Sequence, residues 1–298
     1  PRYWPVWLAF GVLRVLAHLP FRWQMGLGRR LGRLALAVSK KRARIAARNL
    51  RLCFPDKTLA ERRALVHAHF ENLGLSIFEM GMAYYCPRRL LPQITVHGAD
   101  QLEPHAPGAT ILLTAHFGAL EVGGTWLKST GLEFDAVYRK DRSPLVTELI
   151  RRGRLTSGRQ VIEKANIKQM VRSLKQGFPV WYAPDQSYRR KQSALVDFFG
   201  VPAMTNTATS ALARLGGAAV LGFFVHRNAD LSGYDIYISP ALTDFPSKDP
   251  VADSERINRM FEEAVLRTPA QYFWVHRKFK NRPATLPDAY AGLRDEAL

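Results

Sequence analysis

The chain has 298 residues, enough to bury a sizeable core, and its 43 lysine and arginine residues against 25 acidic ones give a net charge of +18. It has only two cysteines, Cys53 and Cys86, without the spacing of a zinc site, which excludes a disulfide-rich secreted scaffold and indicates a reducing, cytosolic environment. The positive charge suits an anionic partner, such as acidic lipid, an acidic protein or nucleic acid.

The first predicted element is an apolar segment from Trp4 to Phe21 that only Arg14 and His18 interrupt. At about 1.5 Å per residue, such a helix is just long enough to span a bilayer. The basic residues that follow would then hold the rest of the chain on the cytoplasmic side. We therefore expect an N-terminal membrane-anchoring helix, and the alternative is a helix that lies in the membrane interface.

A basic amphipathic helix is predicted next, over residues 26–39. One face carries Leu27, Leu31, Leu34 and Val38, and the other carries arginines. This pattern is typical of a helix on an anionic membrane surface, but a helix packed on its own domain with a solvated basic face has the same pattern. We assign residues 1–39 to a membrane anchor and a basic interfacial helix, and residues 40–298 to one folded domain.

A capping box, Thr58-Leu-Ala-Glu61, predicts the start of a long helix with a single apolar stripe. From Ile94 onward, strands and helices alternate. Strands are expected near residues 94–97, 109–115, 134–138, 179–183, 219–225 and 234–239, and helices near residues 144–152, 166–176, 206–215 and 253–267. This alternation predicts an α/β fold with a mixed, largely parallel central sheet flanked by helices.

His116 and Glu121 lie where the buried strand ending near Ala115 gives way to a helical pattern. Ligands bind at the carboxyl ends of strands in open α/β sheets, which favours a site here over a histidine that only satisfies the end of a strand. If Glu121 lies in the first helical turn, its carboxylate can hold one ring nitrogen of His116 while the other takes a proton from a substrate hydroxyl. The sequence thus predicts a general base without a nucleophile of its own.

Charged and polar side chains follow other predicted strands. Arg139 ends one strand, Arg154 ends the helix after it, and Asp185 and Gln186 follow a third. Arginine suits phosphate and carboxylate groups. A carboxylate directly after an apolar strand and a proline needs a partner, and an ion pair between Asp185 and Arg154 would supply one.

Several classes of site lack their sequence motif. The chain has no zinc-binding motif, no Walker or dinucleotide glycine fingerprint and no G-x-S-x-G nucleophile elbow. No metal and no cofactor is expected, and neither is an esterase with its own nucleophile. Since no nucleic-acid-binding module is recognisable, no nucleic-acid partner is expected either.

Motifs along almost the whole chain resemble those of the late acyltransferases of lipid A biosynthesis, in the lauroyltransferase branch of the lysophospholipid acyltransferase superfamily. The residues that carry the resemblance are Arg48-Asn-Leu-x-Leu-Cys-Phe-Pro55, Glu79-x-Gly-Met-Ala83, His116-x-x-x-x-Glu121, Val137-Tyr-Arg139, Gly153-Arg154-Leu, Val180-Trp-Tyr-Ala-Pro-Asp185 and Pro269-x-Gln-Tyr-x-Trp-x-His-Arg-x-Phe-Lys280. Together they are far more specific than the His116 and Glu121 pair alone.

The resemblance implies that residues 40–298 form an acyltransferase catalytic domain on the cytoplasmic side of the bacterial inner membrane. It would transfer a fatty acyl chain, lauroyl or a close relative, from acyl carrier protein to a hydroxyl of a 3-hydroxyacyl chain on a lipid A precursor of the Kdo-lipid IVA type. The carrier's thioester is the only donor implied, and anionic lipid of the inner membrane would be a further partner.

By the same resemblance, His116 is the general base, Glu121 supports it, and Arg154 and Asp185 match positions tied to activity. With Arg139 and Gln186 at the neighbouring strand ends, Arg154 and Asp185 are expected to bind substrate or support the site. The alternative is a membrane-associated basic protein that binds lipid or RNA without catalysis.

Overall fold

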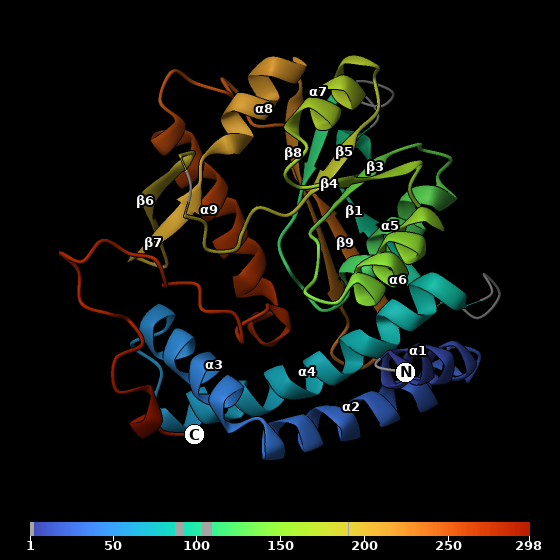
Figure 1. The fold of residues 1–298 in the computed structure, drawn as a ribbon, viewed down its shortest axis with the longest axis vertical. Helices are drawn as coiled ribbons and strands as arrows, with labels where there is room; N and C mark the ends of the chain where they lie inside the picture. Colours follow the sequence, from blue (N-terminus) through green and yellow to red (C-terminus); the bar gives the residue numbers. More distant parts are fainter. Residues whose placement is uncertain (1–2, 87–91, 103–108, 190) are drawn as a thin grey trace.

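The structure, a computed structural model, describes residues 3–86, 92–102, 109–189 and 191–298 (Figure 1). The first helices are α1 (Trp4–Leu16), α2 (Phe21–Val38), α3 (Lys40–Cys53) and α4 (Leu59–Tyr85). Those that follow are α5 (Leu120–Ser129), α6 (Pro144–Leu155), α7 (Ile167–Lys175), α8 (Ala208–Gly216) and α9 (Pro250–Arg267). Single 3-10 turns cover Ala99–Gln101, Pro269–Gln271 and Leu293–Asp295.

A seven-stranded sheet forms the centre of the described part of the chain, in the order β1-β9-β8-β2-β5-β3-β4. Its strands are β1 (Gln93–His97), β2 (Thr110–Leu113), β3 (Asp135–Tyr138), β4 (Gln160–Glu163), β5 (Val180–Tyr182), β8 (Ala219–Arg227) and β9 (Gly233–Ile238). Only β8 and β9 pair antiparallel among the pairs described in this sheet. A separate antiparallel hairpin joins β6 (Ser193–Phe198) to β7 (Val201–Asn206).

These elements confirm the predicted fold class. Every strand and helix predicted after Ile94 is present, and the apolar residues of β2 and β5 are buried on both faces, as central parallel strands require. The sequence did not reveal β4 or the hairpin. β4 has only four residues, and β7 contains Pro202, which is a residue that strands disfavour.

Helix α4 passes the carboxyl end of β8, with α2 alongside it (Figure 1). Arg227, the last residue of β8, donates a hydrogen bond from Nη1 to Oε1 of the buried Glu79 on α4 at 2.9 Å. Gly118, just beyond β2, lies against Ser76 of the same helix. The capping box of α4 is confirmed, since Thr58 and Glu61 each accept from the other's backbone N–H. These contacts fix the position of α4 relative to the carboxyl ends of β2 and β8.

The apolar segment from Trp4 to Phe21 is not the single helix that was predicted. α1 ends at Leu16 after 13 residues, and Pro20 caps the start of α2. A helix of that length spans about 20 Å, whereas the hydrocarbon core of a bilayer is about 30 Å thick. No helix in the described ranges is both long and apolar enough to cross a membrane. The interfacial alternative and the division of the chain at residue 39 stay predictions.

Most of the predicted leucine face of α2 does not pack on the protein: Leu27 is partly buried against the core, but Leu31, Leu34 and Val38 are exposed. The residues that α2 buries are Gln24, Met25, Gly28 and Gly32. The large apolar residues on the outside of α1 and α2 form what we call the N-terminal apolar surface. Its members are Trp4, Trp7, Leu8, Val12, Val15, Trp23, Leu31, Leu34 and Val38. Packing on its own domain therefore does not account for the exposed part of the apolar face of α2, which is Leu31, Leu34 and Val38.

Glycines allow α2 and α4 to pack with their backbones in contact. A Cβ atom at Gly32 would lie 2.1 Å from the carbonyl oxygen of Phe70, and one at Gly74 would lie 2.0 Å from that of Gly28. Neither backbone can yield locally because both belong to long helices. These positions therefore require glycine.

We expect Gly32→Ala to lower the free energy of unfolding by about 2 kcal/mol or more, because the helices must separate to admit the methyl group. Gly26→Ala is the matched control on the same helix, where nothing lies within 4 Å of an added Cβ. It should raise stability by about 0.5 to 1 kcal/mol through helix propensity. Urea titration of both variants measures this, and equal stability of the two would refute the close packing.

Candidate active site

The pairing of β2 with β5 brings His116 and Asp185 together. The strands run parallel, with Leu113 opposite Tyr182, the last residue of each. His116 and Asp185 each follow three residues later, so both chains leave the sheet side by side at its carboxyl edge. The main-chain N–H of Thr114 continues this pairing by donating to the carbonyl of Tyr182 at 2.9 Å.

Asp185 holds His116 at two points. Nδ1 of the imidazole lies 2.5 Å from Oδ1 of Asp185, and the main-chain N–H of His116 donates to Oδ2 at 3.2 Å. The Asp185 side chain is buried, with 1% exposed, whereas 35% of the His116 side chain is exposed. The carboxylate thus fixes both the position and the rotation of a histidine whose ring still meets solvent.

The surroundings of Asp185 keep it ionised. Burial raises the pKa of Asp185, but the charge and hydrogen bonds of His116 and the charge of Lys278 outweigh burial and lower that pKa to about 2. An ionised carboxylate can only accept hydrogen bonds, so Nδ1 of His116 is the donor to Asp185. In the neutral imidazole, Nε2 is then the nitrogen without a hydrogen, and its lone pair can accept a proton.

Lys278 supports Asp185 from the protein interior. Its side chain is buried, and Nζ donates to the main-chain oxygen of Asp185 at 2.5 Å and lies 4.3 Å from the ring centroid of Phe198. Burial lowers the pKa of Lys278 to about 8, and the nearby Asp185 opposes that change. A buried cation and a buried carboxylate therefore stabilise each other behind the histidine.

Glu121 and Arg154 form a second pair in the same region. Oε1 of Glu121, in the first turn of α5, accepts from Nε of Arg154 at 3.1 Å and from Nη2 at 2.6 Å. Nη1 of Arg154 donates to the carbonyl of Val137 at 2.7 Å. The Tyr84 ring occupies the space that a side chain at position 153 would need. Glycine at this position therefore allows α6 to pack against α4, which places Arg154 beside Glu121.

The structure therefore corrects the pairings expected from the sequence. The predicted hydrogen bond from His116 to Glu121 and the predicted ion pair between Asp185 and Arg154 are both wrong, because the partners are exchanged. The neighbour of His116 is decided by which strand pairs with β2, and residue spacing along the chain does not reveal that. Glu121 lies instead on the part of α5 that meets Arg154 of α6.

A cavity of about 200 Å³ opens beside the two pairs. His116, Arg139, Arg154 and Gln186, four of the predicted site residues, line it, while Glu121 and Asp185 lie behind Arg154 and His116. Its other polar lining residues are Thr114, Tyr138, Lys164, Tyr182, Tyr188 and Asn206. Its large apolar ones are Leu120, Val137, Ile150 and Trp181. The cavity thus combines cations, a histidine and an apolar wall.

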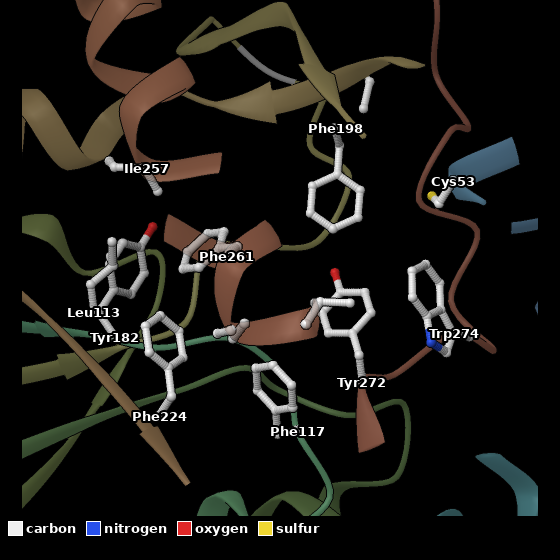
Figure 2. Packing of buried hydrophobic residues seen from close by; sticks show 14 of the residues in the cluster. Cys53, Leu113, Phe117, Tyr182, Phe198, Phe224, Ile257, Phe261, Tyr272 and Trp274 are labelled. Atoms are coloured by element: carbon white, nitrogen blue, oxygen red, sulfur yellow. The ribbon is translucent and has the colours of Figure 1, made fainter. Parts of the chain in front are cut away.

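The C-terminal segment contributes residues to which the sequence assigned no role. The main-chain N–H of Phe273 donates to the carbonyl of His116 at 3.0 Å, and that of Gly118 donates to the carbonyl of Gln271. Burial and the charge of the nearby Asp185 raise the pKa of Tyr272, whose ring packs between Phe117 and Trp274 (Figure 2). In the sequence, only the motif from Pro269 to Lys280 drew attention to this segment, and the motif did not indicate that the segment contacts His116 or Asp185.

No group of three or more histidine, cysteine, aspartate or glutamate side chains that could hold a metal ion occurs within the described ranges.

Residues 1–281 match the family described as bacterial lipid A biosynthesis acyltransferase. The chain is 38% identical to the lipid A biosynthesis lauroyltransferase of Escherichia coli (strain K12) over 97% of this chain and 96% of that protein. It is 37% identical to the lipid A biosynthesis palmitoleoyltransferase of the same strain over 95% of this chain and 93% of that protein.

The chain therefore belongs to the bacterial lipid A biosynthesis acyltransferase family, as its motifs predict. The match covers almost all of the chain, so it includes both strand ends and the C-terminal segment that meet at the cavity.

The folded chain lowers the pKa of Asp185 below its unfolded value of about 3.9. The ionised carboxylate therefore stabilises the fold above about pH 4, and this contribution is lost as the pH falls toward about 2. We expect Asp185→Asn to be less stable than the unsubstituted chain at pH 6, with the difference shrinking toward pH 3. Urea titrations across this range measure the difference. A gap that does not depend on pH would contradict the assigned ionisation of Asp185.

Proposed function

We propose that this chain transfers a fatty acyl chain, lauroyl or a close relative, from acyl carrier protein to a hydroxyl of a 3-hydroxyacyl chain on a lipid A precursor. The observation that carries this proposal is the buried Asp185 carboxylate bound to the partly exposed His116 at a cavity with cationic and apolar walls. No serine or cysteine is among the residues that line the cavity, and the hydroxyl of Thr114, which does line it, is buried and donates to the carbonyl of Ala115. The substrate hydroxyl therefore serves as the nucleophile.

In the proposed reaction, Nε2 of His116 removes the proton of the acceptor hydroxyl as its oxygen attacks the thioester carbonyl carbon. The ionised Asp185, which accepts from Nδ1, stabilises the imidazolium that forms. The tetrahedral intermediate then collapses, the carbon–sulfur bond breaks, and His116 returns the proton to the leaving sulfur. The step needs no other reactant.

Arg154 is suited to stabilise the negative charge that develops on the thioester oxygen. It lines the cavity, and its bonds to Glu121 and Val137 use three of its five N–H groups, so donors remain. In this role Glu121 orients Arg154, which differs from the support of His116 that the sequence suggested. Arg139 and Gln186, on the same cavity wall, remain candidates to bind substrate.

The acyl chain is proposed to lie on the apolar wall formed by Leu120, Val137, Ile150 and Trp181. The relatives named above differ in the acyl group that their names give, at nearly equal identity to this chain. The lauroyl preference is thus the part of the proposal that rests most on the sequence resemblance.

The N-terminal apolar surface supports a location at the cytoplasmic face of the bacterial inner membrane. Trp4, Trp23 and Val38 are each about 70% exposed on it (72%, 69% and 71%), and arginines alternate with its members along α2. Aromatic and aliphatic side chains interleaved with arginines are the composition of helices that lie in anionic membrane interfaces. A lipid acceptor would be reached from that surface.

We expect His116→Ala to lower acyl transfer at least about a hundredfold, because the acceptor hydroxyl loses its general base. The assay combines lauroyl acyl carrier protein with a tetra-acylated, Kdo-bearing lipid A precursor. His67→Ala, an exposed histidine on α4, is the matched control and should keep full activity. Substantial transfer by His116→Ala would refute the general-base role. If the unsubstituted chain transfers nothing but binds anionic lipid or RNA, a binding protein without catalysis is favoured.

The membrane location predicts that Leu31→Glu/Leu34→Glu binds phosphatidylglycerol-containing vesicles at least about tenfold more weakly, because two apolar side chains no longer insert. Leu215→Glu/Leu266→Glu changes two exposed leucines on α8 and α9, and so provides the same change in charge and polarity elsewhere. Sedimentation with vesicles compares the two. Equal loss of binding by both variants would contradict a specific role of the N-terminal apolar surface.

A further inference from the structure

Four cationic side chains from three separate segments gather at the rim of the cavity. Arg42 lies on α3, Arg139 directly follows β3, and Arg277 and Lys280 lie in the C-terminal segment. We call them the rim cluster. Burial and the charges of Arg139, Arg277 and Arg42 lower the pKa of Lys280, so each of the three arginines lies within electrostatic range of Lys280.

The rim cluster is held in place beside the cavity. Arg139 lines the cavity together with His116. The main-chain oxygen of Lys280 accepts a hydrogen bond at 2.9 Å from Oγ of Ser187, whose neighbours Gln186 and Tyr188 both line the cavity. On the other side, Nη1 of Arg42 donates to the carbonyl of Val275 at 3.1 Å, and the guanidinium of Arg277 lies 5.2 Å from the ring centroid of Tyr290.

The rim cluster has no acidic partner within the residues that the structure describes. None of its four members takes part in the ion pairs found there, although arginines elsewhere do: Arg33 pairs with Glu71, Arg154 with Glu121 and Arg159 with Asp135. Like charges held together repel, and a bound anion relieves that repulsion. Arginine forks with a lysine are the donors that proteins use most often for phosphate.

We propose that the rim cluster binds a phosphate monoester on the headgroup of the acceptor lipid, and so decides which hydroxyl reaches His116. This rests on the proposed acyl transfer to a lipid A precursor, which is a phosphorylated lipid. Arg42 follows the exposed Val38 of the N-terminal apolar surface by only four residues. A lipid that arrives from that surface would therefore meet the rim cluster next to the cavity, which favours a lipid phosphate over an acidic protein.

The test compares Arg277→Gln/Lys280→Gln with Arg172→Gln/Lys175→Gln, which removes two exposed cations from α7 at the opposite edge of the sheet. Both are measured in the full chain with phosphatidylcholine vesicles that contain either phosphatidic acid, a phosphate monoester, or phosphatidylglycerol, a diester. We expect the rim variant to bind phosphatidic acid vesicles roughly tenfold more weakly than the control, because charge-assisted hydrogen bonds are lost. Binding to phosphatidylglycerol should be equal in the two variants.

Equal binding of the two variants to phosphatidic acid would overturn the proposal. Inorganic phosphate is a separate probe: if it binds the unsubstituted chain as tightly as lipid-borne phosphate does, the site is one for free phosphate and the lipid assignment fails. These binding measurements do not require catalysis, so they decide the rim cluster even if no acyl transfer is found.

Where transfer is found, the rim variant should raise KM for the acceptor lipid roughly tenfold with kcat nearly unchanged. A rise in KM for the carrier thioester instead would show that the rim cluster docks the acyl donor, and the proposal would be wrong.

Discussion

The parallel pairing of β2 with β5 is the constraint on which the candidate site depends. Leu113 and Tyr182 are partners in that pairing, and the two chains keep the same spacing for three residues beyond it. The Asp185 carboxylate can therefore hold both the backbone and the ring of His116. A register shift of one residue would turn Asp185 toward the other face of the sheet and leave a carboxylate buried without its partner.

The buried charge of Asp185 explains why the C-terminal segment also lies at the site. Asp185 is stable in the interior only because His116, Lys278 and Tyr272 surround it, and the last two belong to the C-terminal segment. That segment must therefore return to the strand ends, where Phe273 also bonds the backbone of His116. The pair of Glu121 and Arg154 is independent of these contacts, since both residues are supplied by helices. The cavity is thus bounded by two charged pairs: His116 with Asp185, which the strand ends and the C-terminal segment hold, and Glu121 with Arg154, which helices hold.

The sequence predicted what depends on local pattern and missed what depends on contact. Apolar runs revealed the strands, and the position of His116 and Asp185 after two of them placed both at the carboxyl edge. Which carboxylate meets the histidine depends on strand order, and one sequence does not contain that information. The apolar face of Leu27, Leu31, Leu34 and Val38 likewise predicted an amphipathic helix. The residues that α2 buries are instead Gln24, Met25, Gly28 and Gly32, and a glycine buried by close backbone contact adds nothing to an apolar pattern.

Helix α4 connects the N-terminal apolar surface to the candidate site. Near its middle, Gly74 contacts the backbone of α2, and further along Glu79 binds Arg227 at the carboxyl end of β8. Near its end, Tyr84 packs against Gly153, the residue before Arg154. These contacts are made by backbone atoms and buried side chains, so α2 and Arg154 cannot move independently without breaking them. A lipid held on the N-terminal apolar surface would consequently be presented at a fixed distance from the cavity, which is a condition for choosing one hydroxyl among several.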